Sequence, residues 1–83
     1  MCCVYLLISE THPRQHYIGL TGNLKKRLAE HNHLRSKHTS KFAPWNLAAY
    51  FAFARRETAV AFEQHLKSHS GKVFLKRHLL PRG

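Results

Sequence analysis

The sequence predicts an α+β fold in which a three-stranded antiparallel sheet is flanked by three helices. Short apolar runs rich in β-branched and aromatic residues are separated by polar breaks, a pattern typical of strands. Other segments combine helix-forming residues with capping and breaking residues at their ends. The chain has 83 residues, which is enough for one domain spanning residues 1–83 and not for two.

The expected order of elements is β-β-α-β-α-α, beginning with a hairpin. Val4–Ile8 and His16–Leu20 are apolar runs joined by a polar loop that contains a proline, as in a β-hairpin. A helix is expected to follow from Leu24 to about residue 34. Either Thr21 or Asn23 is suited to cap it, because both side chains can accept a hydrogen bond from a free backbone N–H.

A polar, basic loop over His33–Pro44 separates this helix from the third expected strand, Trp45–Ala54. The odd-numbered residues of that strand should face one side, and both faces are largely apolar. We therefore expect it to be covered on both sides. Two helices are expected at Glu57–Ser68 and Lys72–Leu80, with Ser70-Gly71 as the break between them.

Charge is the most unusual property of the composition. Fourteen Lys and Arg against four acids give a net charge of +10, which attracts phosphate backbones or anionic membranes. The aromatic residues lie in strand-like runs and not in a basic amphipathic helix, so nucleic acid is the favoured partner. The run Cys2–Ile8 is too short to span a membrane and has no signal-peptide pattern around it. Adjacent Cys2 and Cys3 suit no disulfide, so we expect a cytoplasmic protein.

The scarcity of acids limits the chemistry that the chain can perform. The acidic residues are Glu10, Glu30, Glu57 and Glu63, and there is no Asp. A hydrolytic site must therefore use one carboxylate helped by Arg, Lys, Tyr and His. The eight His residues include the pair His65 and His69, but no complete zinc-ligand spacing is present, so structural zinc is disfavoured.

Glu63 is the acid with the clearest signal. Helical periodicity places it between Ala59 and Val60, on the face that should pack inward. A carboxylate there needs a cation or hydrogen-bond donors to compensate its burial. One interpretation is a ligand for Mg²⁺, which prefers oxygen and keeps several waters around one carboxylate. The other is an ion pair with Lys67, one turn further along the helix.

Arg27 and His31 are four residues apart and share one side of the first expected helix. Arg27 could hold a scissile phosphate through two hydrogen bonds, and His31 could move a proton. The alternative is a solvated basic face together with Lys25 and Lys26, and taken alone such a charge run favours that alternative.

Tyr5 and Tyr17 are single polar aromatics within otherwise apolar strands. Core packing with a satisfied hydroxyl explains most such tyrosines. Gly19, in the second strand, indicates the close approach of another group.

Together these motifs resemble the GIY-YIG endonuclease superfamily, in particular its small stand-alone bacterial members. The opening motif is present as Cys3-Val4-Tyr5 and the second as Tyr17-Ile18-Gly19. The similarity continues through LKKRLAEHN, PWNLAAYFAF and AFEQHLKS and covers nearly the whole chain. It implies a GIY-YIG nuclease-like fold, in agreement with the order of elements expected above.

The resemblance also implies a role for each site residue. Glu63 would bind a single divalent ion, Mg²⁺ or Mn²⁺. Arg27 would contact the scissile phosphate. Tyr5 and Tyr17 would line the site, one of them acting as base or positioning the attacking water, and His31 would assist.

The implied activity is metal-dependent endonuclease cleavage of nucleic acid with low sequence specificity, DNA being favoured over RNA. The cations expected to contact nucleic acid are Lys25, Lys26, Arg35, Lys37, Lys41 and Lys76. The net charge and a missing Asn keep a catalytically weak binding module as an alternative, and an RNA-associated basic protein is a third possibility. Two positions depart from the family pattern. Cys3 stands where the family has Gly, and Lys72–His78 offers no Asn where some relatives carry one. The sequence does not predict the oligomeric state.

Overall fold

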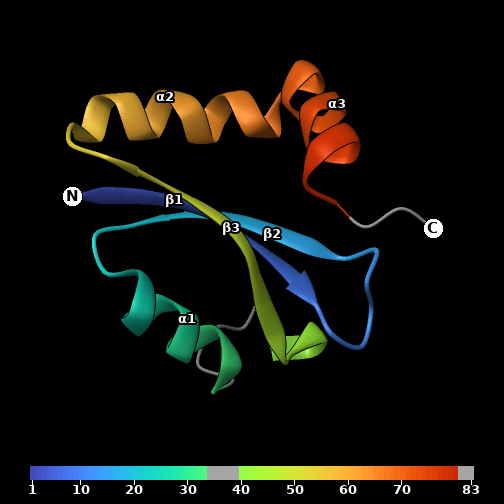
Figure 1. Ribbon diagram of the computed structural model, residues 1–83. Helices are drawn as coiled ribbons and strands as arrows, with labels where there is room; N and C mark the ends of the chain where they lie inside the picture. The colour runs from blue at the N-terminus through green and yellow to red at the C-terminus, as the bar shows by residue number, and fades with distance from the viewer. Residues whose placement is uncertain (34–39, 81–83) are drawn as a thin grey trace.

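The computed structural model describes residues 1–33 and 40–80. Its elements are strand β1 (Cys2–Ser9), strand β2 (His16–Thr21), helix α1 (Leu24–Asn32), the 3₁₀ turn η1 (Ser40–Phe42), strand β3 (Trp45–Phe53), helix α2 (Arg56–Lys67) and helix α3 (His69–His78). Figure 1 shows them in chain order. Apart from the short turn η1, this is the predicted β-β-α-β-α-α order.

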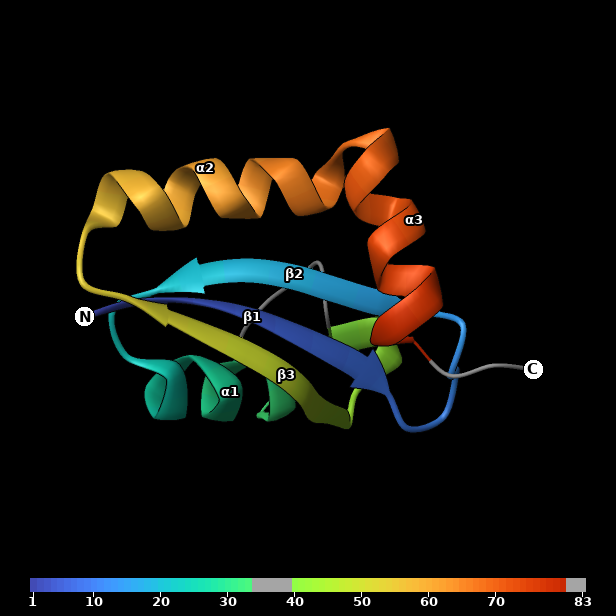
Figure 2. The same cartoon turned by 45° about the horizontal axis from the view of Figure 1, so that its top comes forward.

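The three strands form one antiparallel sheet in the order β2-β1-β3, so the first strand is central. Helix α1 lies on one face of the sheet and helix α2 on the other, with α3 turning from the end of α2 back toward the sheet (Figures 1 and 2). The prediction of an α+β fold with three helices around a three-stranded antiparallel sheet is therefore confirmed.

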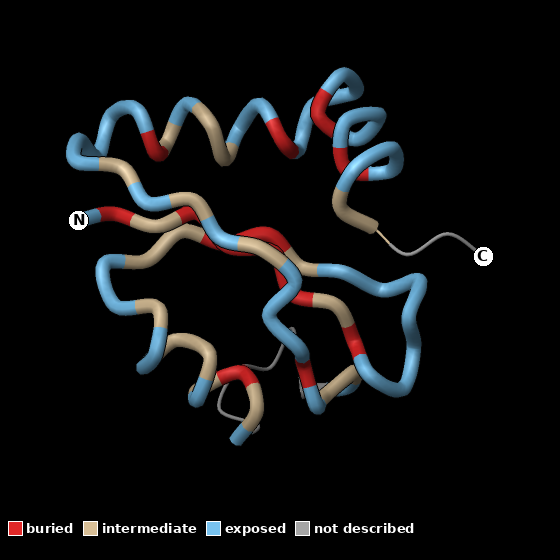
Figure 3. Tube along the Cα trace, viewed as in Figure 1, coloured by how far each residue is buried: buried red, intermediate tan, exposed pale blue. Residues whose placement is uncertain are grey.

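The central strand β1 supplies both halves of the core, which explains why its sequence is apolar without interruption. Val4 and Leu6 pack with residues of α2 and α3, whereas Tyr5 and Leu7 pack toward α1. None of these four side chains is more than 1% exposed. Figure 3 shows the buried residues concentrated on β1 and on the inner sides of the helices. Alternate residues of one buried strand thus stabilise two separate layers.

Strand β3 departs from the expected regular alternation. Its pairing with β1 shifts between Leu6 and Leu7, which leaves Ala48 as an extra residue in the ladder. A bulge of this kind reverses the sides to which the following residues point. Trp45 accordingly belongs to the core cluster on the α1 side, whereas Phe53 packs against the cluster on the α2 side. The expectation that all odd-numbered residues share one face was wrong.

The expectation that β3 is covered on both sides was also wrong. It is an edge strand, and α2 lies mainly over β1 and β2 rather than over β3. Leu47 is 37% exposed and Tyr50 is 57% exposed. Apolar content alone did not distinguish a buried strand from a half-exposed edge, because β-propensity reflects side-chain packing in either setting.

Helix α1 is fixed at both ends by asparagine side chains. Of the two possible caps, Asn23 is the N-cap, and its side chain accepts the Lys26 N–H at 3.1 Å. At the other end Asn32 bonds the backbone of Trp45 twice: its Nδ2 donates to the carbonyl at 3.1 Å and its Oδ1 accepts the N–H at 2.5 Å. These contacts tie α1 to the start of β3 and fix its orientation on the sheet.

The corner between α2 and α3 lies two residues earlier than expected. The break occurs at Ser68, whose Oγ accepts the Gly71 N–H at 3.2 Å as the N-cap of α3. Gly71 is therefore the third residue of a helix and not a breaker. It is buried, and a Cβ added to it would overlap the backbone of His65 and Leu66. The glycine is needed here for close approach of two helices.

Replacing Gly71 with Ala is expected to lower the free energy of unfolding by about 1–3 kcal/mol, because backbone and not a flexible side chain occupies the space. Urea unfolding followed by circular dichroism measures this change. Gly22→Ala is the matched control, since nothing lies within 4 Å of a Cβ at Gly22. Equal stability of the two variants would contradict the proposed packing of α2 against α3.

Candidate active site

The site begins with a close approach between the two strands of the hairpin. The β1–β2 register places Tyr5 directly opposite Gly19. A Cβ at Gly19 would overlap the ring and hydroxyl of Tyr5. The absence of a side chain at Gly19 therefore lets the Tyr5 ring lie over strand β2, with the residue only 1% exposed.

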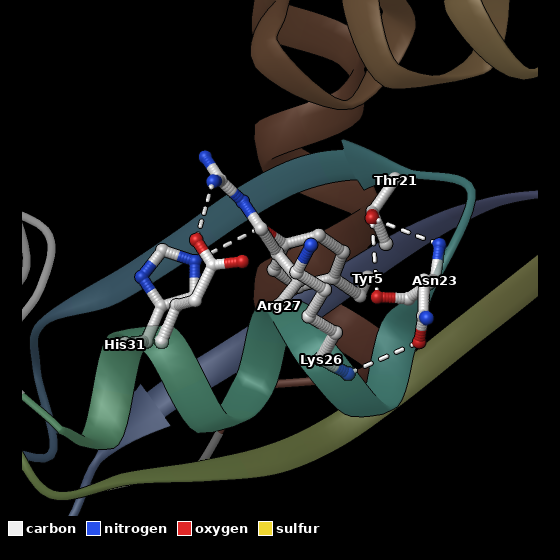
Figure 4. Close-up of polar contacts among 7 residues, drawn as sticks. Tyr5, Thr21, Asn23, Lys26, Arg27 and His31 are labelled. Carbon is white, nitrogen blue, oxygen red and sulfur yellow. Dashed lines mark hydrogen bonds and ion pairs between the residues drawn. The ribbon is translucent and has the colours of Figure 1, made fainter.

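The Tyr5 hydroxyl ends beside His31, which comes from α1. Tyr5 Oη and His31 Nε2 are 2.9 Å apart, and His31 is completely buried. The ring of Tyr17 is 4.9 Å from that of His31 and 6.1 Å from that of Tyr5, measured between centroids. Three aromatic rings from β1, β2 and α1 thus form one cluster, part of which is visible in Figure 4.

Arg27 joins this cluster from one turn earlier on α1. Interaction with the Tyr5 hydroxyl, and to a smaller extent with that of Tyr17, raises the pKa of Arg27. It also makes an ion pair with Glu30 at 3.4 Å, and its side chain remains 40% exposed. Arg27 therefore lies between the buried Tyr5 and solvent, where a ligand can reach the guanidinium.

The environment sets the protonation of Tyr5 and His31. Burial raises the pKa of Tyr5, although the hydrogen bond from Arg27 acts in the opposite direction. Burial, followed by the positive charge of Arg27, lowers the pKa of His31. At neutral pH the cluster therefore holds a protonated phenol beside a neutral imidazole, which can accept a proton.

Glu63 lies apart from this cluster. Figure 1 shows its helix, α2, on the face of the sheet opposite α1. The Glu63 carboxylate is 3.5 Å from Lys67 Nζ, and the two side chains are 19% and 54% exposed. The ion pair considered from the sequence is therefore present. The structure brings together Tyr5, Tyr17 and the two α1 residues, but the contacts of the described residues do not join Glu63 to them.

The cations predicted to contact nucleic acid are spread over three elements. Lys25 and Lys26 are exposed on α1, and Lys76 is exposed on α3. Lys41 is exposed in η1, with its Nζ 5.6 Å from the Phe42 ring centroid. The predicted contacts Arg35 and Lys37 lie outside the described residues. No helix in the described part of the chain is long and apolar enough to cross a membrane.

Two charged residues near the cluster were not identified from the sequence. Glu30 pairs with Arg27, and its position three residues further along the helix was a usable signal. Arg56 is the first residue of α2 and lines a pocket of about 460 Å³ together with Arg27. Sequence patterns did not indicate that Arg56 lies near Arg27, because this depends on how two helices distant in sequence pack around the sheet.

Comparison with known proteins agrees with this arrangement. Residues 1–77 match the family model of the GIY-YIG catalytic domain. The chain belongs to the GIY-YIG family. It is also 36% identical over 66 residues to a UPF0213 protein of Lacticaseibacillus paracasei, a match covering 75% of this chain and 74% of the relative. Membership of the GIY-YIG family supports a nuclease-type function, with nucleic acid as the substrate.

The family implies a divalent metal ion, and its binding depends on which side chains can act as ligands. Within residues 1–33 and 40–80 there is no group of three or more His, Cys, Asp or Glu that could hold a metal. A Mg²⁺ ion that keeps most of its waters requires only one carboxylate. Glu63 offers a partly exposed carboxylate whose described partner, Lys67, is itself half exposed and able to move away. The donor set therefore fits a single-carboxylate site.

The lowered pKa of His31 predicts a specific dependence of stability on pH. Below its ordinary pKa of 6.5, the unfolded chain binds a proton that the folded state resists. The free energy of unfolding should therefore fall as pH falls from 6.5 toward the folded pKa, by up to ~1.4 kcal/mol per pH unit from this residue. Urea unfolding between pH 7 and pH 5 measures the slope.

His31→Gln is the control for this measurement, and it should have a shallower slope than the wild type. Some slope should remain, because burial and the charge of Lys72 lower the pKa of His16 as well. Identical slopes in wild type and variant would show that His31 is not held neutral by the fold.

Proposed function

We propose that this protein is a metal-dependent endonuclease that hydrolyses phosphodiester bonds, preferably in DNA and with low sequence specificity. The observation that carries the proposal is the contact between Tyr5 and His31 at 2.9 Å, with Arg27 beside both. A buried neutral imidazole bonded to a phenol, next to an accessible guanidinium, supplies both a proton acceptor and a phosphate-binding group.

Arg27 would bind the scissile phosphate. Its guanidinium reaches solvent, and the 3.4 Å ion pair with Glu30 is long and partly exposed, so exchange of that carboxylate for a phosphate costs little. Two parallel N–H donors match two phosphate oxygens. The same group stabilises the charge that develops on those oxygens during attack.

Tyr5 and His31 would activate the attacking water together. The water proton moves to Tyr5 Oη as the phenolic proton moves to His31 Nε2, so the phenol stays neutral throughout. The lowered pKa of His31 keeps Nε2 free to accept at neutral pH. Tyr17, whose ring packs on His31, would hold the water on the side of the phosphate opposite the leaving oxygen.

Glu63 would hold one Mg²⁺ or Mn²⁺. When bound, such an ion neutralises charge on the phosphate and stabilises the leaving oxygen. Support for Glu63 comes from its partly buried carboxylate and from the motif that it occupies. Glu30 is the competing carboxylate, because it lies next to Arg27.

The net charge of +10 supports binding to the backbone rather than to bases. This is the basis for proposing low sequence specificity. The second candidate function is a nucleic-acid-binding module without strong activity. It is favoured by one observation, that Glu63 is paired with Lys67 on the opposite face of the sheet from the aromatic cluster.

The test is cleavage of labelled plasmid, single-stranded DNA, branched DNA and structured RNA with Mg²⁺ or Mn²⁺. Tyr5→Phe and Arg27→Ala should each reduce the single-turnover rate by about 10²–10⁴-fold, because each removes a group that acts on the reacting atoms. Glu63→Gln should lose activity at any metal concentration. EDTA should stop the wild type.

Glu30→Gln is the matched control for Glu63→Gln, and it should cut within about 10-fold of the wild type because the resulting amide leaves Arg27 in place. The reverse result, with Glu30→Gln inactive and Glu63→Gln active, would assign the ion to Glu30. Absence of cleavage by a wild-type protein that binds all substrates would establish the binding module instead.

A further inference from the structure

A pocket at one end of the sheet contains cations that the proposed chemistry does not use. It encloses about 460 Å³ where the end of β2, the start of α1 and the start of α2 meet, and we call it the β2–α1–α2 pocket. Gly22, Lys26, Arg27, Glu30 and Arg56 are among its lining residues. Figures 1 and 2 both show the first turns of α1 and α2 at the same end of the sheet.

The charges of this pocket favour an anion. Three cations, Lys26, Arg27 and Arg56, face one carboxylate, Glu30, which leaves a net charge of +2. Glu30 is already paired with Arg27. Lys26 and Arg56 are both exposed, and neither makes an ion pair with a described residue. Two cations from different helices are thus available to one ligand.

Local hydrogen bonds hold the turn that forms one wall of the pocket. Thr21 Oγ1 accepts the Asn23 N–H at 3.0 Å and donates to the Asn23 carbonyl at 3.2 Å. The Asn23 side chain caps the Lys26 N–H, a set of contacts drawn in Figure 4. The turn is therefore held in shape before any ligand arrives. Recognition is left to side-chain cations, which suits a phosphate rather than a base edge.

Arg27 places this pocket next to the reacting atoms. The same guanidinium lines the pocket and lies close enough to Tyr5 and Tyr17 for their hydroxyls to raise its pKa. Because Arg27 shares this pocket with Lys26 and Arg56, a nucleic-acid strand held at one phosphate by Arg27 can bring a neighbouring phosphate to those two cations. This follows because backbone phosphates are spaced regularly along a strand.

We propose that the β2–α1–α2 pocket is a second phosphate subsite, in which Lys26 and Arg56 bind the backbone phosphate adjacent to the scissile one. The inference rests on the proposed function of Arg27 and extends it to a residue, Arg56, from the opposite layer of the fold. Lys26 and Arg56 are positioning residues, since they fix the register of the strand and do not touch the bond that breaks.

The first test is binding of a short fluorescein-labelled oligonucleotide, single-stranded and duplex, in EDTA so that nothing is cut. Arg56→Ala should weaken binding about 5-fold and reduce the slope of log K against log salt by about 0.7–0.9. Arg55→Ala is the matched control. It removes the same charge from the neighbouring residue, which is 82% exposed, lies 3.9 Å from Glu57 and is not among the pocket residues.

Arg55→Ala should change affinity and salt slope less than half as much as Arg56→Ala. Equal effects of the two variants would overturn the subsite, because they would show that only net charge matters. Circular dichroism of both variants checks that α2 still forms.

The second test adds a charge to the pocket. Nothing lies within 4 Å of a Cβ at Gly22, and the Gly22 backbone is outside the left-handed region. A side chain is therefore tolerated there. Gly22→Asp should bind the oligonucleotide about 5-fold more weakly than Gly22→Ala, and Gly22→Lys more tightly. An Asp just before α1 also interacts favourably with the positive end of the helix dipole and so stabilises α1. Weaker binding by Gly22→Asp would therefore not result from unfolding of this helix.

Identical affinities for Gly22→Ala, Gly22→Asp and Gly22→Lys would overturn the subsite. These measurements are separable from the test of the proposed function. Binding in EDTA reports on the pocket even if the wild type cuts nothing, whereas loss of cleavage in Tyr5→Phe reports on the chemistry even if all Gly22 variants bind alike.

Discussion

The arrangement of the site depends on the contact between Tyr5 and Gly19 on neighbouring strands. The register of the hairpin places these residues opposite each other. Because Gly19 has no Cβ, the Tyr5 ring can cross strand β2 and reach His31. A larger residue at Gly19 would fill the space that the ring occupies. The backbone pairing of the sheet thus determines where the Tyr5 hydroxyl lies.

Alternation of side chains along β1 lets this one strand serve two layers. On β1, Val4 and Leu6 bury aliphatic surface against α2 and α3, whereas Tyr5 and Leu7 face α1. The α2 side stabilises the fold mainly through apolar burial. The α1 side carries the polar cluster, in which hydrogen bonds satisfy the buried hydroxyl and imidazole. The aliphatic core and the aromatic polar cluster therefore lie on opposite faces of a single sheet.

The features predictable from the sequence were those encoded by local periodicity. The apolar run of β1 and the shared helical side of Arg27 and His31 follow from periods of 2 and 3.6 residues, and capping chemistry narrowed the start of α1 to Thr21 or Asn23. Tyr5, Tyr17 and Gly19 were each weak evidence for a site. Their order along the chain, together with the other motifs, produced the resemblance to the GIY-YIG superfamily.

The features that were missed depend on contacts between distant segments. The bulge at Ala48 reverses the faces of β3, and no local pattern indicates an extra residue in a ladder. The start of α3 at His69 follows from capping by Ser68, which competed with the more obvious Gly71. The approach of Arg56 to Arg27 depends on how two helices on opposite faces meet at the end of the sheet.

The most direct measurement is the single-turnover cleavage rate of Gly19→Ala with Mg²⁺, on whichever DNA the wild type cuts. An added methyl group should displace the Tyr5 ring from His31, so the rate should fall at least about 100-fold. Far-ultraviolet circular dichroism and oligonucleotide affinity should remain close to those of the wild type. A Gly19→Ala protein that cuts at the wild-type rate would contradict the claim that the Tyr5–Gly19 contact builds the active site.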